Sequence, residues 1–297
     1  MTHYRVTHLT HYHYSAPVTL CHNEAHLLPR NLSCQRCLDA RLHISPRPTV
    51  YQERKDFFGN RVVYFSIEEP HETLAVTALS ELQLFPLPLP ALEATPGWEE
   101  VQRRLRSEVS RGVLEARQFL LDSPFISAQA SFADYARMSF APERPLLSAV
   151  HELMRRIFTE FTYDPEFTTI ATPVSEVLVH QRGVCQDFAH FAIACMRSLG
   201  LAARYVSGYL ETIPREGQPQ LLGAAASHAW VSVYCPELGW VDFDPTNNLM
   251  PSDRHIIVAW GRDYSDVPPL KGTLLGGVNH DLTVGVEMRK IEENELP

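Results

Sequence analysis

The chain has 297 residues, enough for two domains with buried cores, and its 45% hydrophobic and 21% charged residues are typical of a globular protein. A formal net charge of -9 argues against nucleic acid or an anionic membrane as the main partner, because either favours a basic surface. The first residues lack the apolar core of a signal peptide, and no run of 18 apolar residues occurs. We therefore expect a cytoplasmic protein with no membrane partner. Its six scattered cysteines are expected to be free thiols.

The first part of the chain favours β-strands. Segments rich in β-branched and aromatic residues alternate with segments that carry Pro, Asn and Gly, including the turn signal DFFGNR at 56–61. Alternating prolines then begin at Pro86, which favours a stiff, extended linker. We therefore predict an all-β N-terminal domain over residues 1–88. The expected strands are 4–14, 39–46, 61–69 and 74–85.

After the prolines the pattern changes to helix. Residues 98–121 and 145–160 carry apolar side chains at three- and four-residue spacing. We predict a linker and helical segment over 89–145, followed by a catalytic core over 146–297. Helices that precede strands indicate an α+β fold for this core. Its expected strands are 203–212, 227–235, 239–244, 255–261 and 282–291.

One helix carries a cysteine near its start. In RGVCQDFAHFAIACMRSLG, residues 182–200, apolar positions that include Cys185, Phe188 and Ala192 share one face. A lone helical cysteine is most often a small core residue. Cys185, however, lies in or beside the first turn, where free N–H groups favour a thiolate and can bind an oxyanion. Cys195 lies in the middle of the helix and is interpreted as core.

A nucleophilic thiol needs a base. His190 lies roughly 140° around the helix from Cys185 and faces elsewhere, so it is excluded as the base. His180 lies before the helix, and nothing in the sequence supports it as the base. Residues 225–248 predict a β-hairpin in which His228 lies on one strand and Asp244 ends the other, before a proline. His228 is therefore the better candidate for the base.

The register of this hairpin decides whether the two side chains meet. If Tyr234 pairs with Trp240, Asp244 lies opposite Trp230 and diagonal to His228, within reach of its side chain. If Cys235 pairs with Trp240, Asp244 points to the opposite face of the sheet. The prediction of a Cys-His-Asp triad thus requires the first register.

The roles of the triad follow from its chemistry. Cys185 attacks a carbonyl carbon, His228 accepts and later donates the proton, and Asp244 orients the imidazole. The backbone N–H of Cys185 supplies one oxyanion donor, with Tyr163 and Gln181 as candidates for the second.

The ordered segments FTYDP (161–165), TPVSEVL (172–178), RGVCQDFAH (182–190), ARYVSGY (203–209), SHAW (227–230) and GWVDFDPTN (239–247) together resemble the transglutaminase-like cysteine peptidase superfamily. The N-terminal β region and the closing GRDYSDVPPLKG resemble its bacterial branch, in which a β domain precedes the core. The resemblance implies a papain-like α+β core, with a catalytic cysteine at Cys185, histidine at His228 and aspartate at Asp244. Asp242 is the alternative orienting residue.

We expect a thiol-dependent hydrolase that cleaves amide or peptide bonds through a thioester and acts on a peptide or protein substrate. The alternatives are a protein-glutamine acyltransferase with the same triad and a catalytically silent binding module. The sequence gives no prediction of oligomeric state.

No cofactor or metal is predicted. The single CxxC motif of Cys34 and Cys37 supplies only two of four zinc ligands, and His43 with the N-terminal histidines His3, His8, His11 and His13 is interpreted as structural. Asp187 and His190, three residues apart, are interpreted as a surface pair or a capping contact on the polar face of the helix.

Overall fold

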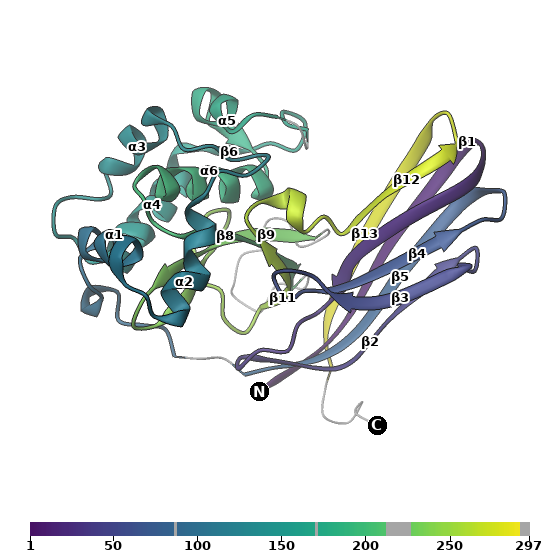
Figure 1. Cartoon of the computed structure of the whole chain (residues 1–297), viewed down its shortest axis with the longest axis horizontal. Helices are drawn as coiled ribbons and strands as arrows, with labels where there is room; N and C mark the ends of the chain where they lie inside the picture. Colours follow the sequence, from purple (N-terminus) through teal and green to yellow (C-terminus); the bar gives the residue numbers. More distant parts are fainter. Residues whose placement is uncertain (86–87, 170–171, 212–226, 292–297) are drawn as a thin grey trace.

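The computed structural model describes residues 1–85, 88–169, 172–211 and 227–291, so Pro86 of the linker and Thr212 of one expected strand lie outside the described residues. Figure 1 shows an elongated β region beside a region of helices packed on a smaller sheet. This arrangement confirms the predicted α+β class with a β-rich N-terminal region. Among the residues described, no helix is both long and apolar enough to cross a bilayer.

A single long strand organises the N-terminal sheet. The strand β1 spans Thr2–Leu28, well beyond the expected 4–14, because its first half pairs with β5 and its second half with β4, with a register shift between them. The strand order is β2-β5-β1-β4-β3. The other strands are β2 (Gln35–Ser45), β3 (Val50–Lys55), β4 (Arg61–Ile67) and β5 (His71–Leu84).

The closing strands of the chain join this sheet. The strand expected at 282–291 is predicted to belong to the catalytic core, but β12 (Leu270–Gly276) and β13 (His280–Ile291) both pair with β1. In Figure 1 they lie as yellow strands beside the purple β1. Alternating hydrophobicity predicts that one face of a strand is buried, but it does not say which sheet offers a free edge. The assignment to the core was therefore wrong for these strands.

The helical segment folds back on itself. The expected helix 98–121 divides into α1 (Trp98–Ser107), α2 (Arg111–Arg117) and a short 3₁₀ turn, η2 (Gln118–Leu120). The Arg117 side chain donates to the carbonyl oxygens of Leu105, Arg106 and Glu108, and so satisfies acceptors that the end of α1 leaves free. The remaining elements of this segment are η1 (Leu92–Ala94) and α3 (Ala130–Arg137), and α4 (Leu146–Glu160) opens the predicted core.

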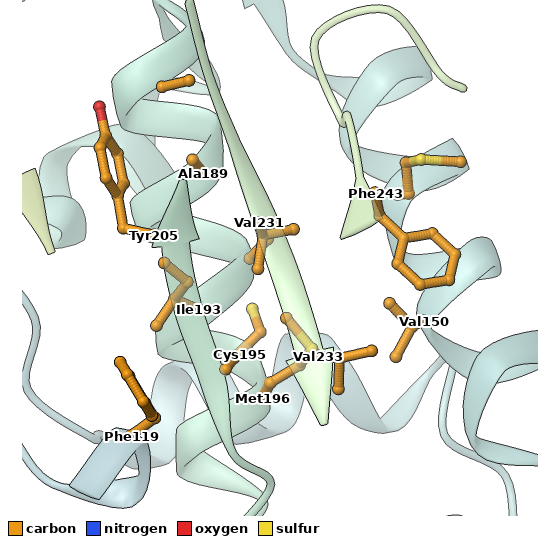
Figure 2. Close-up of a cluster of buried hydrophobic side chains, with 14 of the residues drawn as sticks. Phe119, Val150, Ala189, Ile193, Cys195, Met196, Tyr205, Val231, Val233 and Phe243 are labelled. Atoms are coloured by element: carbon orange, nitrogen blue, oxygen red, sulfur yellow. The ribbon is translucent and has the colours of Figure 1, made fainter. Parts of the chain in front are cut away.

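The core consists of a sheet of order β10-β9-β8-β11 with α6 (Cys185–Ser198) packed on one face. Figure 2 shows Ala189, Ile193 and Cys195 of α6 facing Val231 and Val233 of β9. The helix ends as predicted before Gly200, whose φ of 73° is left-handed. The sheet strands are β8 (Ala203–Leu210), β9 (His228–Cys235), β10 (Gly239–Phe243) and β11 (His255–Gly261). The elements β6 (Thr162–Tyr163), α5 (Val174–His180), β7 (Arg182–Gly183) and η3 (Tyr264–Asp266) lie around this core.

Candidate active site

Cys185 is the first residue of α6 and is partly buried. The helix start is fixed by Asp187, whose Oδ2 accepts the backbone N–H of Val184 at 2.8 Å and the hydroxyl of Thr168 at 2.7 Å. Gly183 allows this contact, since a Cβ on it would lie 2.7 Å from the Asp187 carboxylate. The sequence before Cys185 therefore holds the thiol at a rigid helix N-terminus, where the first N–H groups are free to bind an anion.

The histidines nearest to Cys185 in sequence serve other contacts. His190 stacks on Phe125, and its Nε2 accepts the backbone N–H of Tyr264 at 3.1 Å. His180 packs edge-on against Phe167. Asp187 and His190 are both buried, so the expectation of a polar surface face was wrong, whereas the capping contact of Asp187 is present. The helix α3 packs against α6, and Tyr264 of η3 contacts His190.

The hairpin of β9 and β10 has the register that the triad requires. Trp240 pairs with Tyr234, and Phe243 pairs with Val231. Asp244 then lies level with Trp230, and its Oδ2 is 2.8 Å from Nε2 of His228. Both side chains are fully buried.

Asp244 is held as a carboxylate by many donors. Its Oδ1 accepts the backbone N–H groups of Thr246 and Asn247 at 3.0 and 3.3 Å, and the Asn247 side-chain amide donates to Oδ2 at 2.8 Å. Burial opposes ionisation, but the imidazoles of His228 and His255 hold the pKa of Asp244 well below its usual range. The carboxylate is therefore charged and fixed in orientation.

His228 is built as a base. Because Asp244 can only accept, Nε2 of His228 carries the proton and Nδ1 is left without a hydrogen bond among the described residues. Burial alone would lower the pKa of His228, but the Asp244 carboxylate, with a smaller contribution from the Cys185 thiol, raises it to about 10. With its pKa raised in this way, the imidazole holds the thiol proton on Nδ1 near neutral pH, and Asp244 stabilises the resulting imidazolium beside the Cys185 thiolate.

Two further residues complete the network, and sequence reasoning missed both. Nε2 of His255, the first residue of β11, is 3.2 Å from the same Oδ2 of Asp244, and burial lowers the pKa of His255, which keeps it neutral. Asn247 could have been found, because an aspartate before Pro-Thr-Asn is typical of a turn in which the side chain binds the following backbone. His255 had no such signal, since it begins an ordinary apolar strand.

Trp230 covers this network from the sheet. Its ring centroid lies 6.0 Å from that of His228 and 5.1 Å from that of His255. The ring fits because the neighbouring strand carries Gly208, where a Cβ would lie 2.5 Å from the indole. The indole excludes water from the imidazole–carboxylate pair, which strengthens their interaction.

Asp242, the alternative orienting residue, has a different partner. Its Oδ2 accepts the indole N–H of Trp230 at 3.0 Å. The carboxylate that contacts His228 is that of Asp244.

The two candidates for the second oxyanion donor lie in different surroundings. Tyr163, on β6, lies close enough to Cys185 for the thiol to influence its hydroxyl, and burial, with smaller contributions from Cys185 and Asp187, raises its pKa to about 12. Gln181 is exposed in the turn after α5, with a left-handed φ of 51°. Tyr163 therefore stays the stronger candidate.

His228, Asp244 and His255 also form a group whose ligand atoms lie within 4.8 Å of one another, the spacing of a metal site. Both imidazoles point Nε2 at a single carboxylate oxygen, at 2.8 and 3.2 Å. A metal ion would have to displace both N–H protons and both hydrogen bonds. The hydrogen bonds account for the cluster without an ion.

The other motifs form no part of this network, although Cys34 lies near Asp242. Cys34 and Cys37 are free thiols just before and within β2, where Cys37 donates to the carbonyl of Asp39. Of the N-terminal histidines, His3 and His8 are buried, and Nδ1 of His8 lies 3.1 Å from the Tyr209 hydroxyl. These contacts are structural.

Comparison with known proteins identifies the family of the chain. Residues 4–83 match the bacterial transglutaminase-like N-terminal region, and residues 133–245, which include Cys185, His228 and Asp244, match the transglutaminase-like superfamily. An uncharacterized protein of Mycobacterium tuberculosis is 42% identical over 99% of this chain and 94% of its own length. The chain belongs to the transglutaminase-like superfamily. Its transglutaminase-like core carries the candidate triad, and its bacterial N-terminal region supplies β1 to β5.

Two further relatives extend the comparison of this transglutaminase-like chain. A candidate cysteine protease from Cytophaga hutchinsonii shares its fold, with a TM-score of 0.76 and 21% identity over 100% of this chain and 93% of that one. A protein-glutamine gamma-glutamyltransferase of Pseudomonas aeruginosa is 32% identical over 124 residues, which cover 41% of this chain and 18% of that protein. The similarity to the Cytophaga protein shows that the two chains share a fold. The similarity to the Pseudomonas protein is limited to less than half of this chain.

Proposed function

We propose that the protein is a thiol-dependent hydrolase of amide or peptide bonds. The observation that carries the proposal is the buried pair of His228 and Asp244, with the thiol of Cys185 near enough to raise the pKa of the imidazole. A nucleophile at a helix N-terminus, a base and an orienting carboxylate form the arrangement that acyl transfer requires.

The thiol proton rests on Nδ1 of His228, and the reaction begins when the thiolate of Cys185 attacks the carbonyl carbon. A C–S bond forms as the carbonyl π electrons move to the oxygen, which the backbone N–H of Cys185 stabilises. Collapse of this intermediate breaks the C–N bond, and the imidazolium gives its proton to the leaving amine. Tyr163 is the proposed second donor to the oxyanion.

The second half of the reaction releases the acyl group. A water molecule gives a proton to His228 and attacks the thioester carbon, and the C–S bond breaks to yield a carboxylic acid and the thiol. Asp244 acts in both halves because it stabilises each imidazolium without accepting its proton.

Transfer to an amine is the second candidate. In this reaction a primary amine replaces water as the acceptor, and a glutamine side chain is the acyl donor. The stretch of 32% identity to a protein-glutamine gamma-glutamyltransferase favours this alternative.

The test is incubation of the purified protein with a library of peptides that includes glutamine-containing members, with and without cadaverine, followed by mass spectrometry. New peptide termini or deamidated glutamine without the amine support hydrolysis, while cadaverine adducts in excess of hydrolysis support transfer. If no product forms, or if Cys185→Ser forms the same products as the wild type, the proposal is wrong and the silent binding module is favoured.

A further inference from the structure

A cavity of about 530 Å³ lies between the N-terminal sheet and the core sheet, on the side away from α6. Most of its wall is apolar and comes from both parts of the chain, for example Leu84, Pro90 and Met250. Its volume is in the range of sites for small ligands. The lining does not include Cys185 or His228, so this cavity is separate from the thiol.

A buried arginine forms part of the wall. Arg204 of β8 is 6% exposed, and its guanidinium lies between two indoles, with its central carbon 4.3 Å from the ring of Trp240 and 3.8 Å from the ring of Trp260. The strand pairings explain the placement, because Arg204 pairs with Ser232 and Trp240 pairs with Tyr234, which puts these side chains on one face of the sheet. Stacking on two indoles leaves only the edge of the guanidinium to make hydrogen bonds.

This guanidinium has no acidic partner at ion-pair distance among the described residues. Its Nε is buried without a hydrogen bond. Asp242 is near enough to favour the charged form of Arg204 but keeps its own hydrogen bond to Trp230. Burial lowers the pKa of Arg204 to about 9, so the group is still charged at neutral pH. A buried cation without a partner is costly, which indicates that a ligand supplies the missing charge.

A second cation adds to the positive potential. Arg30 lies over the ring of Trp260 at 3.5 Å, and its side chain donates to Phe58 and Asn60. The charged residues in the wall of the cavity are thus Arg204 and Asp242, and Arg30 lies behind the wall with the carboxylate of Asp56 near it.

We propose that this cavity binds a carboxylate carried on an apolar group, with the carboxylate on the edge of Arg204 and the apolar group against the leucine, proline and methionine wall. A planar guanidinium edge matches the two oxygens of a carboxylate. A phosphate dianion fits less well, because one free guanidinium edge beside Asp242 supplies too few donors and too little positive charge. The ligand is either a small free acid or the C-terminal carboxylate of a peptide.

The cavity lies next to the catalytic network. Asp242 and His255 both line it, and His255 contacts the same Asp244 that orients His228. A ligand in the cavity therefore contacts the back of the imidazole–carboxylate network, without contacting the thiol itself.

The test measures binding to the full-length protein by isothermal titration calorimetry, with tryptophan fluorescence as a report from Trp240 and Trp260. The probes are hexanoate and 4-phenylbutyrate, their neutral amides, inorganic phosphate, and the peptide acetyl-Phe-Leu as free acid and as C-terminal amide. We expect the acids to bind at least about tenfold more tightly than the matched amides, because a hydrogen bond to a charged group is lost in the amides. Binding of the small acids identifies a free-acid site, and binding of the peptide acid alone identifies a peptide C-terminus.

Two variants test the assignment to Arg204. Arg204→Met removes the charge but keeps an unbranched apolar chain between the indoles, and we expect it to bind acid and amide equally. Asp242→Asn keeps an acceptor for Trp230 and removes the nearby negative charge, so it should bind the acids more tightly than wild type. Because this change strengthens binding, it tests the proposal even if Arg204→Met does not fold. The proposal is overturned if the wild type binds acid and amide equally, binds phosphate more tightly than the acids, or binds no acid. It is also overturned if Asp242→Asn binds the acids more weakly than the wild type does.

Discussion

The two ends of α6 place the same residue type in different chemical surroundings. Cys195, near the C-terminal end, is fully buried against the aliphatic side chains of β9, and burial raises its pKa. Cys185, at the N-terminal end, is only partly buried and lies beside His228, the first residue of the same strand. The difference teaches that helix periodicity identifies the buried face, while the position along the helix and the facing strand decide whether a thiol packs or reacts.

The largest expected effect separates these two cysteines directly. If the protein cleaves amides, Cys185→Ser should lower kcat/KM by about ten-thousandfold or more, because the hydroxyl is a far weaker nucleophile in this site. Cys195→Ala should keep the activity and lower the free energy of unfolding by about 1 kcal/mol. Steady-state kinetics and urea unfolding measure the two quantities. If Cys195→Ala lost activity and Cys185→Ser kept it, the roles assigned to the two cysteines would be wrong.

Asp244→Asn tests why the surroundings of Cys185 differ. We expect kcat to fall by about a thousandfold or more, because an asparagine does not stabilise the imidazolium. The pKa of His228 should fall below its ordinary value, since burial remains and the carboxylate that raises it is gone. NMR titration of the imidazole in the Cys185→Ser background measures this pKa. Asp242→Asn is the matched control on the same strand, and an equal pKa change there would contradict the assignment.

His255 is expected to act through Asp244 as a positioning residue. His255→Leu removes one donor from the carboxylate, which raises the pKa of Asp244, and should lower kcat by about tenfold. The acidic limb of the pH profile of kcat/KM should move to higher pH in the same variant. His255→Gln, which restores a donor, should recover both quantities. A uniform loss with an unchanged pH profile and no recovery would indicate a purely structural role.

The smallest expected effect is on stability at alkaline pH. The pKa of His228 is raised from 6.5 to about 10 in the folded protein, so its contribution to stability is complete below pH 6.5 and is lost as the pH rises through 10. In the Cys185→Ser background, Tm should therefore fall more between pH 7 and 10 than in the same protein with His228→Gln. Calorimetry of the two proteins at matched pH gives the comparison, and parallel curves would argue against a raised pKa.

The sequence predicted the parts of the site that depend on local periodicity. Strand alternation left two registers open, of which only one puts Asp244 on the face of His228, and the observed pairing of Trp240 with Tyr234 is that register. The helix pattern likewise excluded His190 as the base. These features depend on neighbours along the chain, which sequence reasoning can follow.

The missed parts depend on contacts between distant elements. His255 reaches Asp244 because β11 pairs with β8, and β13 completes the N-terminal sheet because β1 offers an edge at the opposite end of the chain. Arg204 was interpreted only as part of a strand, although a charged residue within the apolar run ARYVSGY was a signal that something must balance it. The path of the chain between elements is needed to find such partners.

The most direct test of the central claim is the alkylation of Cys185. Wild type and His228→Ala are treated with iodoacetamide from pH 5 to 9, and peptide mapping by mass spectrometry gives a separate rate for Cys185 and Cys195. We predict that Cys185 of the wild type reacts faster near neutral pH than a model thiol, and that His228→Ala slows it by about tenfold or more while Cys195 stays unreactive in both folded proteins. A Cys185 that reacts no faster than the model thiol and is unaffected by the loss of His228 would contradict the account.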